Sequence, residues 1–132
     1  MQAIGLDMKE TTCSCAECRQ MCERSCCLPT PDEARALIRA GHGARLSRYS
    51  FPAGRVIGPS PAGMEGADLT DTNHGACTFY RGGLCELHDA GLKPLEGRLA
   101  GHGKPWLPIR QHVVSHWRGK RFESVSAMLG RS

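Results

Sequence analysis

Six of the eight cysteines in this 132-residue chain fall within fifteen consecutive positions. Charged side chains such as Glu17 and Arg24 are interleaved with them. One buried cysteine behaves as a small hydrophobic residue, but six thiols among charges are not explained by packing. A thiolate is a soft, charged ligand for Zn²⁺, Cu(I) or an iron–sulfur cluster, and four ligands close a tetrahedral site. The cluster therefore predicts metal ligation, with a redox disulfide relay as the weaker alternative.

The remaining composition indicates a thin hydrophobic core. Aromatic residues make up 5% of the chain, whereas it contains 16 glycines and 8 prolines. Small domains short of apolar surface are commonly fixed by metals or disulfides. We therefore expect one metal-binding domain over residues 1–132, and neither a large single-core enzyme, a coiled coil nor a disordered tail.

The chain shows no export or membrane signal. It lacks a run of about 18 apolar residues, the length needed to cross a bilayer, and residues 1–10 have neither the basic nor the apolar region of a signal peptide. We therefore expect a cytoplasmic location with no membrane partner. Disulfides seldom persist in a reducing cytosol, which again favours metal ligation for the eight cysteines.

The formal net charge of +4 is concentrated late in the chain, because residues 98–132 contain seven Lys or Arg and one acidic residue, Glu123. A basic segment of this kind can contact nucleic acid. However, metal-bound thiolates would bring the whole molecule close to neutral. We therefore expect a protein partner, or a metal donor or acceptor, and do not expect nucleic acid.

The strongest local signal is a helix start. Thr30 is a good N-cap, Pro31 suits the first helical position, and Glu33 completes a capping box. Gly41 is a suitable stop. These residues predict a helix over residues 31–40.

The rest of the chain predicts less regular structure. Glycine and proline recur so often in residues 41–72 that we expect a long irregular loop there, with Arg55-Val56-Ile57 as a short strand. Residues 77–80 and 84–87 flank a turn that contains Gly82-Gly83. This arrangement predicts a β-hairpin with Cys77 and Cys85 near its open end. Apolar residues at helical spacing over 109–129 predict a C-terminal helix, with Gly119 as a candidate interruption.

Together these elements predict a small, helix-rich α+β fold. It consists of a metal-organised Cys-rich N-terminal segment, one β-hairpin, a long irregular loop and a C-terminal helix.

The spacing within the first cluster is typical of metal ligands. Cys15 and Cys18 have the spacing of a metal knuckle, while Cys18, Cys22 and Cys26 recur every four residues and would line one face of a helix. Adjacent Cys26 and Cys27 do not point the same way on a regular backbone. They would therefore serve two different ions or bridge them.

The order of these segments is similar to that of a known family. The cluster ends in Cys26-Cys27 and is followed by the helix start, by Cys77-Thr78-Phe79, by the run Gly83-Leu84-Cys85-Glu86-Leu87-His88 and by residues 93–98. Over roughly residues 13–100 the chain resembles the YkgJ-type cysteine-cluster proteins, a family with a CxxCxxCC pattern described as zinc- or iron-chelating. The resemblance implies a metal-binding protein without implying its biological role.

Two departures from the family pattern affect the assignment of ligands. The gaps in the first cluster are longer than those of the family, and Gly97 stands where the family commonly has a cysteine. Either Cys13, His88 or His102 replaces the missing ligand, or nothing does. The predicted metal ligands are Cys15, Cys18, Cys22, Cys26, Cys27, Cys77, Cys85 and His88.

The histidines leave alternatives open. His88 lies three residues after Cys85, an ordinary zinc-ligand spacing, and His74 and His102 are further candidates. His112 and His116 form an i, i+4 pair of the kind that can chelate a metal on a helix. No Glu follows the first histidine of this pair, so the zincin motif is absent, and an exposed polar flank is the simpler interpretation.

We predict that the chain binds one or two Zn²⁺ ions as a structural, interaction or metal-handling module. An iron site or an iron–sulfur cluster, serving electron transfer or an enzyme complex, is the alternative. The cysteine spacing differs from the ferredoxin run, which favours zinc. The sequence has no convincing acid–base pair, so an enzyme is the least favoured class.

Overall fold

The computed structural model of the chain describes residues 26–52, 54–69, 76–81, 84–85, 87, 94–99 and 106–130. The regular elements, in chain order, are α2 (Pro31–Arg39), η1 (Gly43–Arg45), β1 (Leu46–Phe51), β2 (Gly54–Pro59), β3 (Tyr80–Arg81), β4 (Leu84–Cys85), α4 (Leu95–Leu99), α5 (Trp106–Ser115) and α6 (Arg121–Leu129). Helices and strands are thus both present, and the predicted small α+β class is confirmed at this level.

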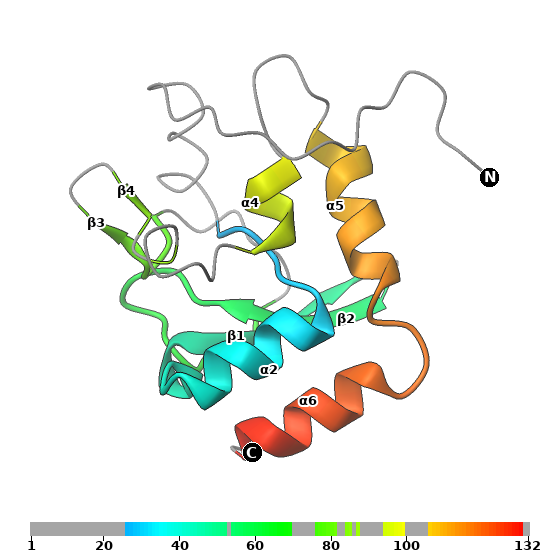
Figure 1. Cartoon of the computed structure of the whole chain (residues 1–132), viewed down its shortest axis with the longest axis horizontal. Helices are drawn as coiled ribbons and strands as arrows, with labels where there is room; N and C mark the ends of the chain where they lie inside the picture. Colours follow the sequence, from blue (N-terminus) through cyan, green and yellow to red (C-terminus); the bar gives the residue numbers. More distant parts are fainter. Residues whose placement is uncertain are drawn as a thin grey trace.

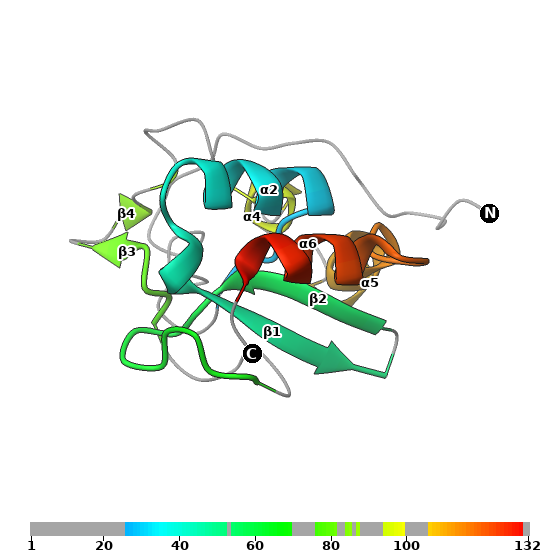
Figure 2. The same ribbon diagram turned by 90° about the horizontal axis from the view of Figure 1, so that it is seen from below.

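The largest sheet is the antiparallel pair β1–β2, and helices cover it. Helices α2, α5 and α6 all contact β2, and α2 also packs against α6 (Figure 1). Seen from below, the helices lie on one side of the β1–β2 pair (Figure 2). The described part of the chain is therefore built as a helical layer on a two-stranded sheet.

Helix α2 forms where the capping signals predict it. The Thr30 side chain accepts a hydrogen bond from the Glu33 amide, and the Glu33 side chain accepts one from the Thr30 amide. At the other end, the amide of His42 donates to the Leu37 carbonyl and the amide of Gly41 to the Ile38 carbonyl. This six-residue closure requires a left-handed residue, which Gly41 supplies with a φ of 93°.

The prediction of a long irregular loop over residues 41–72 is wrong for the central part of this segment. β1 and β2 form a hairpin there, with Leu46 opposite Pro59 and Phe51 opposite Gly54. The predicted strand Arg55-Val56-Ile57 is confirmed as part of β2. The sequence gives no strand signal for β1, because its apolar residues Leu46, Tyr49 and Phe51 do not alternate strictly with polar ones.

The second hairpin is confirmed in a shorter form than predicted. Tyr80 pairs with Cys85 and Arg81 with Leu84, so the strands have two residues each. Cys77 precedes β3 in a turn and forms an isolated antiparallel bridge with Pro61. The two cysteines therefore do not face each other across the hairpin, because Tyr80 occupies the position opposite Cys85.

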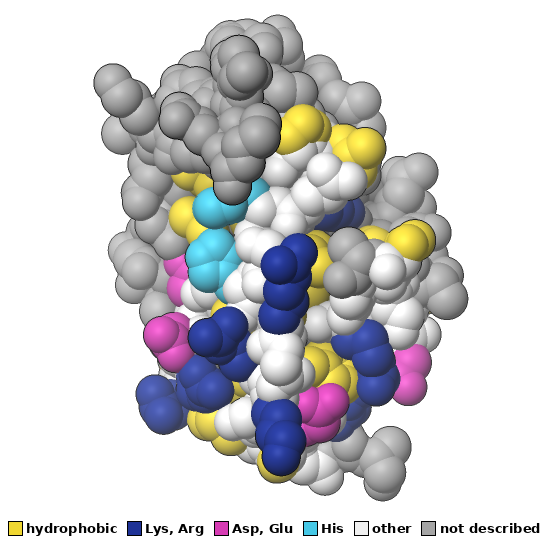
Figure 3. All heavy atoms as spheres, turned by 90° about the vertical axis from the view of Figure 1, so that its right-hand side faces the viewer, with side chains coloured by type: hydrophobic (Ala, Val, Ile, Leu, Met, Phe, Trp, Pro, Cys, Tyr) yellow, Lys and Arg dark blue, Asp and Glu magenta, His cyan; other side chains and the backbone are white. Residues whose placement is uncertain are grey.

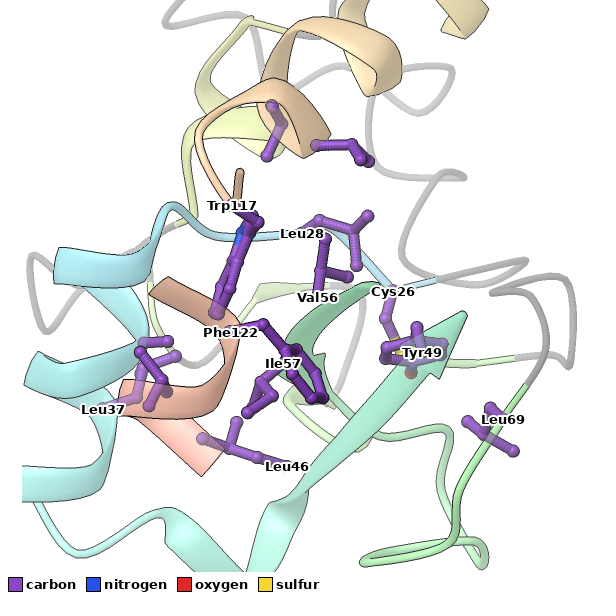
Figure 4. Packing of buried hydrophobic residues seen from close by; sticks show 14 of the residues in the cluster. Cys26, Leu28, Leu37, Leu46, Tyr49, Val56, Ile57, Leu69, Trp117 and Phe122 are labelled. Atoms are coloured by element: carbon purple, nitrogen blue, oxygen red, sulfur yellow. The ribbon is translucent and has the colours of Figure 1, made fainter. Parts of the chain in front are cut away.

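The predicted C-terminal helix is two helices, α5 and α6. Gly119 lies between them with a φ of 75°, a conformation that a helix does not contain, so the interruption considered at this position is confirmed. Residues buried on both helices join a single hydrophobic cluster with α2 and both strands of the β1–β2 sheet (Figure 4). Within the described residues, no helix is long and apolar enough to cross a membrane.

Candidate metal centre

The described chain begins at the end of the cysteine cluster, and this end is held inside the core. Residues 26–29 are all buried. The carbonyl of Cys26 accepts a hydrogen bond from the Arg110 guanidinium at 3.1 Å. The amide of Leu28 donates to the Glu96 carboxylate at 2.9 Å. Backbone groups of this segment are therefore fixed by side chains from α4 and α5.

Two further hydrogen bonds hold the same segment. The Leu28 carbonyl accepts from the Glu96 amide at 3.2 Å, and the Pro29 carbonyl accepts from Nε1 of Trp117 at 2.9 Å. Glu96 and Arg110 are themselves joined by an ion pair that is almost completely buried. Such a pair is sensitive to the loss of either partner, because a single buried charge is expensive. These hydrogen bonds therefore fix the position of the segment that ends the cysteine cluster.

The Cys77 segment is fixed on the other side of the same region. The amide of Thr78 donates to the Ser60 carbonyl and the amide of Ala62 to the Ala76 carbonyl, both at 2.9 Å. Arg45 donates to the Thr78 carbonyl at 2.9 Å. These bonds place Cys77 beside the chain that leaves β2.

Cys26 and Cys77 lie in the same buried cluster as Tyr49. Tyr49 is fully buried on β1, and both cysteines are near enough to shift the pKa of its hydroxyl. The labelled side chains of Cys26 and Tyr49 lie against each other in the core (Figure 4). Thiols from the two predicted clusters therefore lie in the same buried cluster of the core.

The protonation of Tyr49 follows from this environment. Burial raises the pKa of Tyr49 far above its ordinary value, Cys26 and Cys77 raise it further, and Arg110 opposes the increase. The hydroxyl proton is donated to the Pro59 carbonyl at 2.5 Å.

Gly58 permits the close packing that brings the Cys26 segment onto β2. A Cβ atom at Gly58 would lie 2.9 Å from Cδ of Pro29 and 3.2 Å from Cδ2 of Leu28. A side chain there would displace the segment that follows Cys26. The glycine is therefore part of the construction of the site.

The structure describes only some of the predicted ligands. Cys26, Cys27 and Cys77 are buried, and no disulfide joins them to one another. Cys85 lies on β4, where only its backbone is described. Cys13, Cys15, Cys18, Cys22, His74, His88 and His102 lie outside the described residues. Across the ranges that are described, no three Cys, His, Asp or Glu side chains gather as a metal site.

Three residues of the site were not singled out from the sequence. Tyr49 gave no signal, because an isolated tyrosine in a Gly- and Pro-rich stretch has no motif. Glu96 lies within residues 93–98, which drew attention only for a missing cysteine. Arg110 was counted as part of the basic segment, yet it is 4% exposed and its charge is neutralised by Glu96.

Four exposed cations lie around the turn between α5 and α6. We call this set, Arg55, Arg118, Lys120 and Arg121, the basic surface; all four side chains are exposed. Arg55 lies over the ring of Phe122 at 4.1 Å, which connects β2 to α6. Figure 3 shows Lys and Arg side chains gathered on this side of the molecule, with histidines next to them.

Comparison with known proteins gives one partial relationship. The chain is 35% identical over 85 residues to Protein MEI2-like 7 of rice, a match that covers 64% of this chain and 22% of that protein. The chain thus spans about a fifth of the length of the curated relative it matches. No family model matches the chain, and no solved structure matches it.

This match corrects the expectation about partners. MEI2-like proteins are an RNA-binding family, so the prediction that nucleic acid is not a partner is wrong as an exclusion. Bound thiolates would neutralise the positive charge of the molecule only as a whole. Charges act locally on a partner, however, and the basic surface keeps its field whatever the net charge is.

Proposed function

We propose that the chain is a cysteine-cluster metal-binding protein of the YkgJ type that holds one or two Zn²⁺ ions in a reducing, cytoplasmic environment. Iron or an iron–sulfur cluster is the alternative occupant. The observation that supports the proposal is that Cys26 and Cys77 are buried in one cluster of the core, together with Tyr49. These cysteines belong to two clusters far apart in the sequence, and a metal-closed domain requires them to meet.

Two thiols do not complete a tetrahedral site, so the proposal assigns the other ligands to the remaining cysteines and histidines. Cys27 directly follows Cys26, and Cys85 is paired through its backbone with Tyr80, three residues after Cys77. Cys15, Cys18, Cys22 and His88 complete the proposed set. Thiolates suit zinc and iron–sulfur clusters better than harder cations, so Ca²⁺ and Mg²⁺ are not proposed.

The surroundings of Cys26 suit a ligand. The ligands of a metal are usually oriented by an outer layer of hydrogen bonds. Here the Cys26 backbone is held by Arg110, and its side chain lies against Tyr49 in the core (Figure 4). Metal binding to such thiol sites contributes about 10–16 kcal/mol in apparent terms, which is large beside the stability of a small domain.

Elemental analysis of the full chain, purified without oxygen from unsupplemented cells, tests this proposal. We expect one or two zinc ions per chain in the wild type and a loss of at least one ion in Cys26→Ser and in Cys77→Ser. Thr78→Ala is the matched control, because it alters the neighbour of Cys77 and keeps every thiol. A brown protein with broad visible absorption would identify the iron–sulfur alternative. Wild-type protein that neither contains nor takes up zinc or iron contradicts metal binding.

We propose RNA binding as a second candidate function, on a different observation. The chain matches a member of an RNA-binding family, and it has four exposed cations around the α5–α6 turn. Lys and Arg bind phosphates through contacts that are sequence-independent and sensitive to salt. The basic surface is thus the part of the described chain that suits a nucleic-acid backbone.

Binding of a fluorescent single-stranded RNA at several salt concentrations tests this second function. We expect the triple variant Arg118→Ala, Lys120→Ala, Arg121→Ala to bind more weakly and with a shallower dependence on salt. Arg39→Ala is the matched control, since this exposed arginine lies at the last residue of α2, at the other end of the α2–α6 pair (Figure 1). Equal binding by the triple variant, or no binding by the wild type, contradicts an RNA-binding role for this surface.

A further inference from the structure

Two histidines lie together at the C-terminal end of α5. The ring centroids of His112 and His116 are 5.1 Å apart, and the rings are nearly perpendicular, at 89°. Both side chains are half-buried, so each ring remains partly accessible to solvent. Histidine side chains lie next to each other on the face shown in Figure 3.

A hydrogen bond determines which nitrogen of His116 is available. Nδ1 of His116 lies 3.0 Å from the carbonyl oxygen of His112. A carbonyl oxygen only accepts, so Nδ1 donates, and the lone pair of the neutral ring is on Nε2. Metal-binding histidines commonly have this arrangement, in which one nitrogen donates to an oxygen and the other faces the metal.

The end of the helix explains why the ring is held in this way. The amide of His116 donates to the Val113 carbonyl rather than to that of His112. The His112 carbonyl is therefore left to side chains, and it accepts from the Ser115 hydroxyl at 2.6 Å as well as from His116. The hydrogen bond to the His112 carbonyl therefore orients the His116 ring without the need for a bound metal ion.

We propose that His112 and His116 form a second metal site, separate from the cysteine cluster, for a divalent transition metal such as Zn²⁺, Ni²⁺ or Cu²⁺. Imidazole suits these metals, and two histidines four residues apart on a helix can chelate one ion. Water completes the coordination, so the site is open and its metal exchanges readily. The exposed cations Arg118, Lys120 and Arg121 repel a divalent ion, and salt screens this repulsion, so affinity rises with ionic strength.

Titration of the tag-free, Zn²⁺-supplemented full chain with Ni²⁺ tests the site, with calorimetry and the histidine ring signals in NMR as readouts. We expect the ring signals of His112 and His116 to broaden first as Ni²⁺ is added. His112→Asn and His116→Asn should each weaken this binding by more than about tenfold, the lower limit for losing even an outer partner of a metal ligand.

Asparagine removes the metal-binding nitrogen while it keeps a hydrogen-bond donor at the end of the helix, so the two roles of His116 can be tested separately. An asparagine side chain at 116 can still donate to the His112 carbonyl but has no nitrogen in the place of Nε2, so the metal-free variant should unfold near the wild-type temperature. Gln111→Ala, at an exposed neighbouring position on α5, is the matched control and should bind Ni²⁺ as the wild type does. Unchanged Ni²⁺ affinity in either asparagine variant, or broadening that begins at other histidines, overturns the proposal. The ring signals of His112 and His116 report on this site whether or not the cysteine cluster holds zinc.

Discussion

The carboxylate of Glu96 and the guanidinium of Arg110 meet through two short hydrogen bonds, one at 2.5 Å from Nε and one at 2.6 Å from a terminal nitrogen. The two residues link α4 to α5 inside the core. Each also holds one backbone group of the segment that ends the cysteine cluster, Glu96 at Leu28 and Arg110 at Cys26. The ion pair therefore couples the packing of two helices to the position of a predicted metal ligand.

Replacing Glu96 by Gln should destabilise the protein by about 3–5 kcal/mol, the usual loss when one partner of a buried ion pair is removed. The reason is that the Arg110 charge remains buried without a carboxylate. Urea unfolding of metal-free protein measures the effect. Glu123→Gln, an exposed change on α6, is the control and should leave stability within about 0.5 kcal/mol of the wild type. Equal stabilities of the two variants would contradict the role assigned to the pair.

Alkaline pH should unfold the protein through Tyr49. Because burial raises the pKa of Tyr49, the native chain keeps this proton above pH ~10, where the unfolded chain loses it. The contribution of Tyr49 to the free energy of unfolding is therefore complete below that pH, and it decreases by about 1.4 kcal/mol for each pH unit above it.

A Tyr80→Phe variant measures this effect, since it leaves Tyr49 as the remaining tyrosine of the two in the chain. We expect the phenolate absorbance to appear together with the loss of helical circular dichroism. A Tyr49→Phe variant should lose stability less steeply with rising pH. Phenolate formation in a protein that still has native circular dichroism would show that Tyr49 is not buried as described.

Gly58→Ala should destabilise the protein by about 1–3 kcal/mol, the range for overpacking a filled core. The added methyl group would lie 2.9 Å from Pro29, so the segment after Cys26 must move. Thermal and urea unfolding measure the effect, and a reduced zinc content would indicate that the metal site moves too. Gly43→Ala is the matched control, because its new Cβ would lie 3.7 Å from Leu129, an ordinary contact. A Gly58→Ala variant as stable as the control would contradict the close approach.

The ring of His112 should titrate at lower pH than an ordinary histidine. Burial lowers the pKa of His112, and the neighbouring His116 lowers it further. A histidine whose pKa is lowered in the native state stabilises it above the ordinary pKa of about 6.5, and this contribution is lost as the pH falls. NMR titration of the metal-free chain measures it. His116→Asn should raise the pKa of His112 in part, whereas an ordinary value in the wild type would contradict the environment described.

Elements with local determinants could be predicted from the sequence. Helix α2 has its start in Thr30 and Glu33 and its end in Gly41, all within one short segment. The second hairpin follows from its two central glycines, and the break between α5 and α6 from Gly119. In each case the residues that decide the structure are neighbours in the chain.

The pairing of β1 with β2 and the burial of Cys26 and Cys77 in one cluster with Tyr49 could not be predicted in this way. They depend on contacts between distant residues, and no pattern in the sequence identifies Tyr49 as the neighbour of both Cys26 and Cys77. Arg110 shows the same limit, because its burial depends on Glu96, 14 residues away on another helix. The sequence identifies candidate thiols, whereas the structure supplies the residues that hold two of them in place.

The anchoring of residues 26–29 has a consequence for biosynthesis. The bonds that hold this segment come from residues 68, 84 and 88 positions later in the chain. The cysteines of the first cluster are therefore synthesised long before Glu96, Arg110 and Trp117. During that interval the hydrogen bonds that fix residues 26–29 have not formed. An ion or oxidant can therefore react with the nascent thiols before the native structure holds them in place.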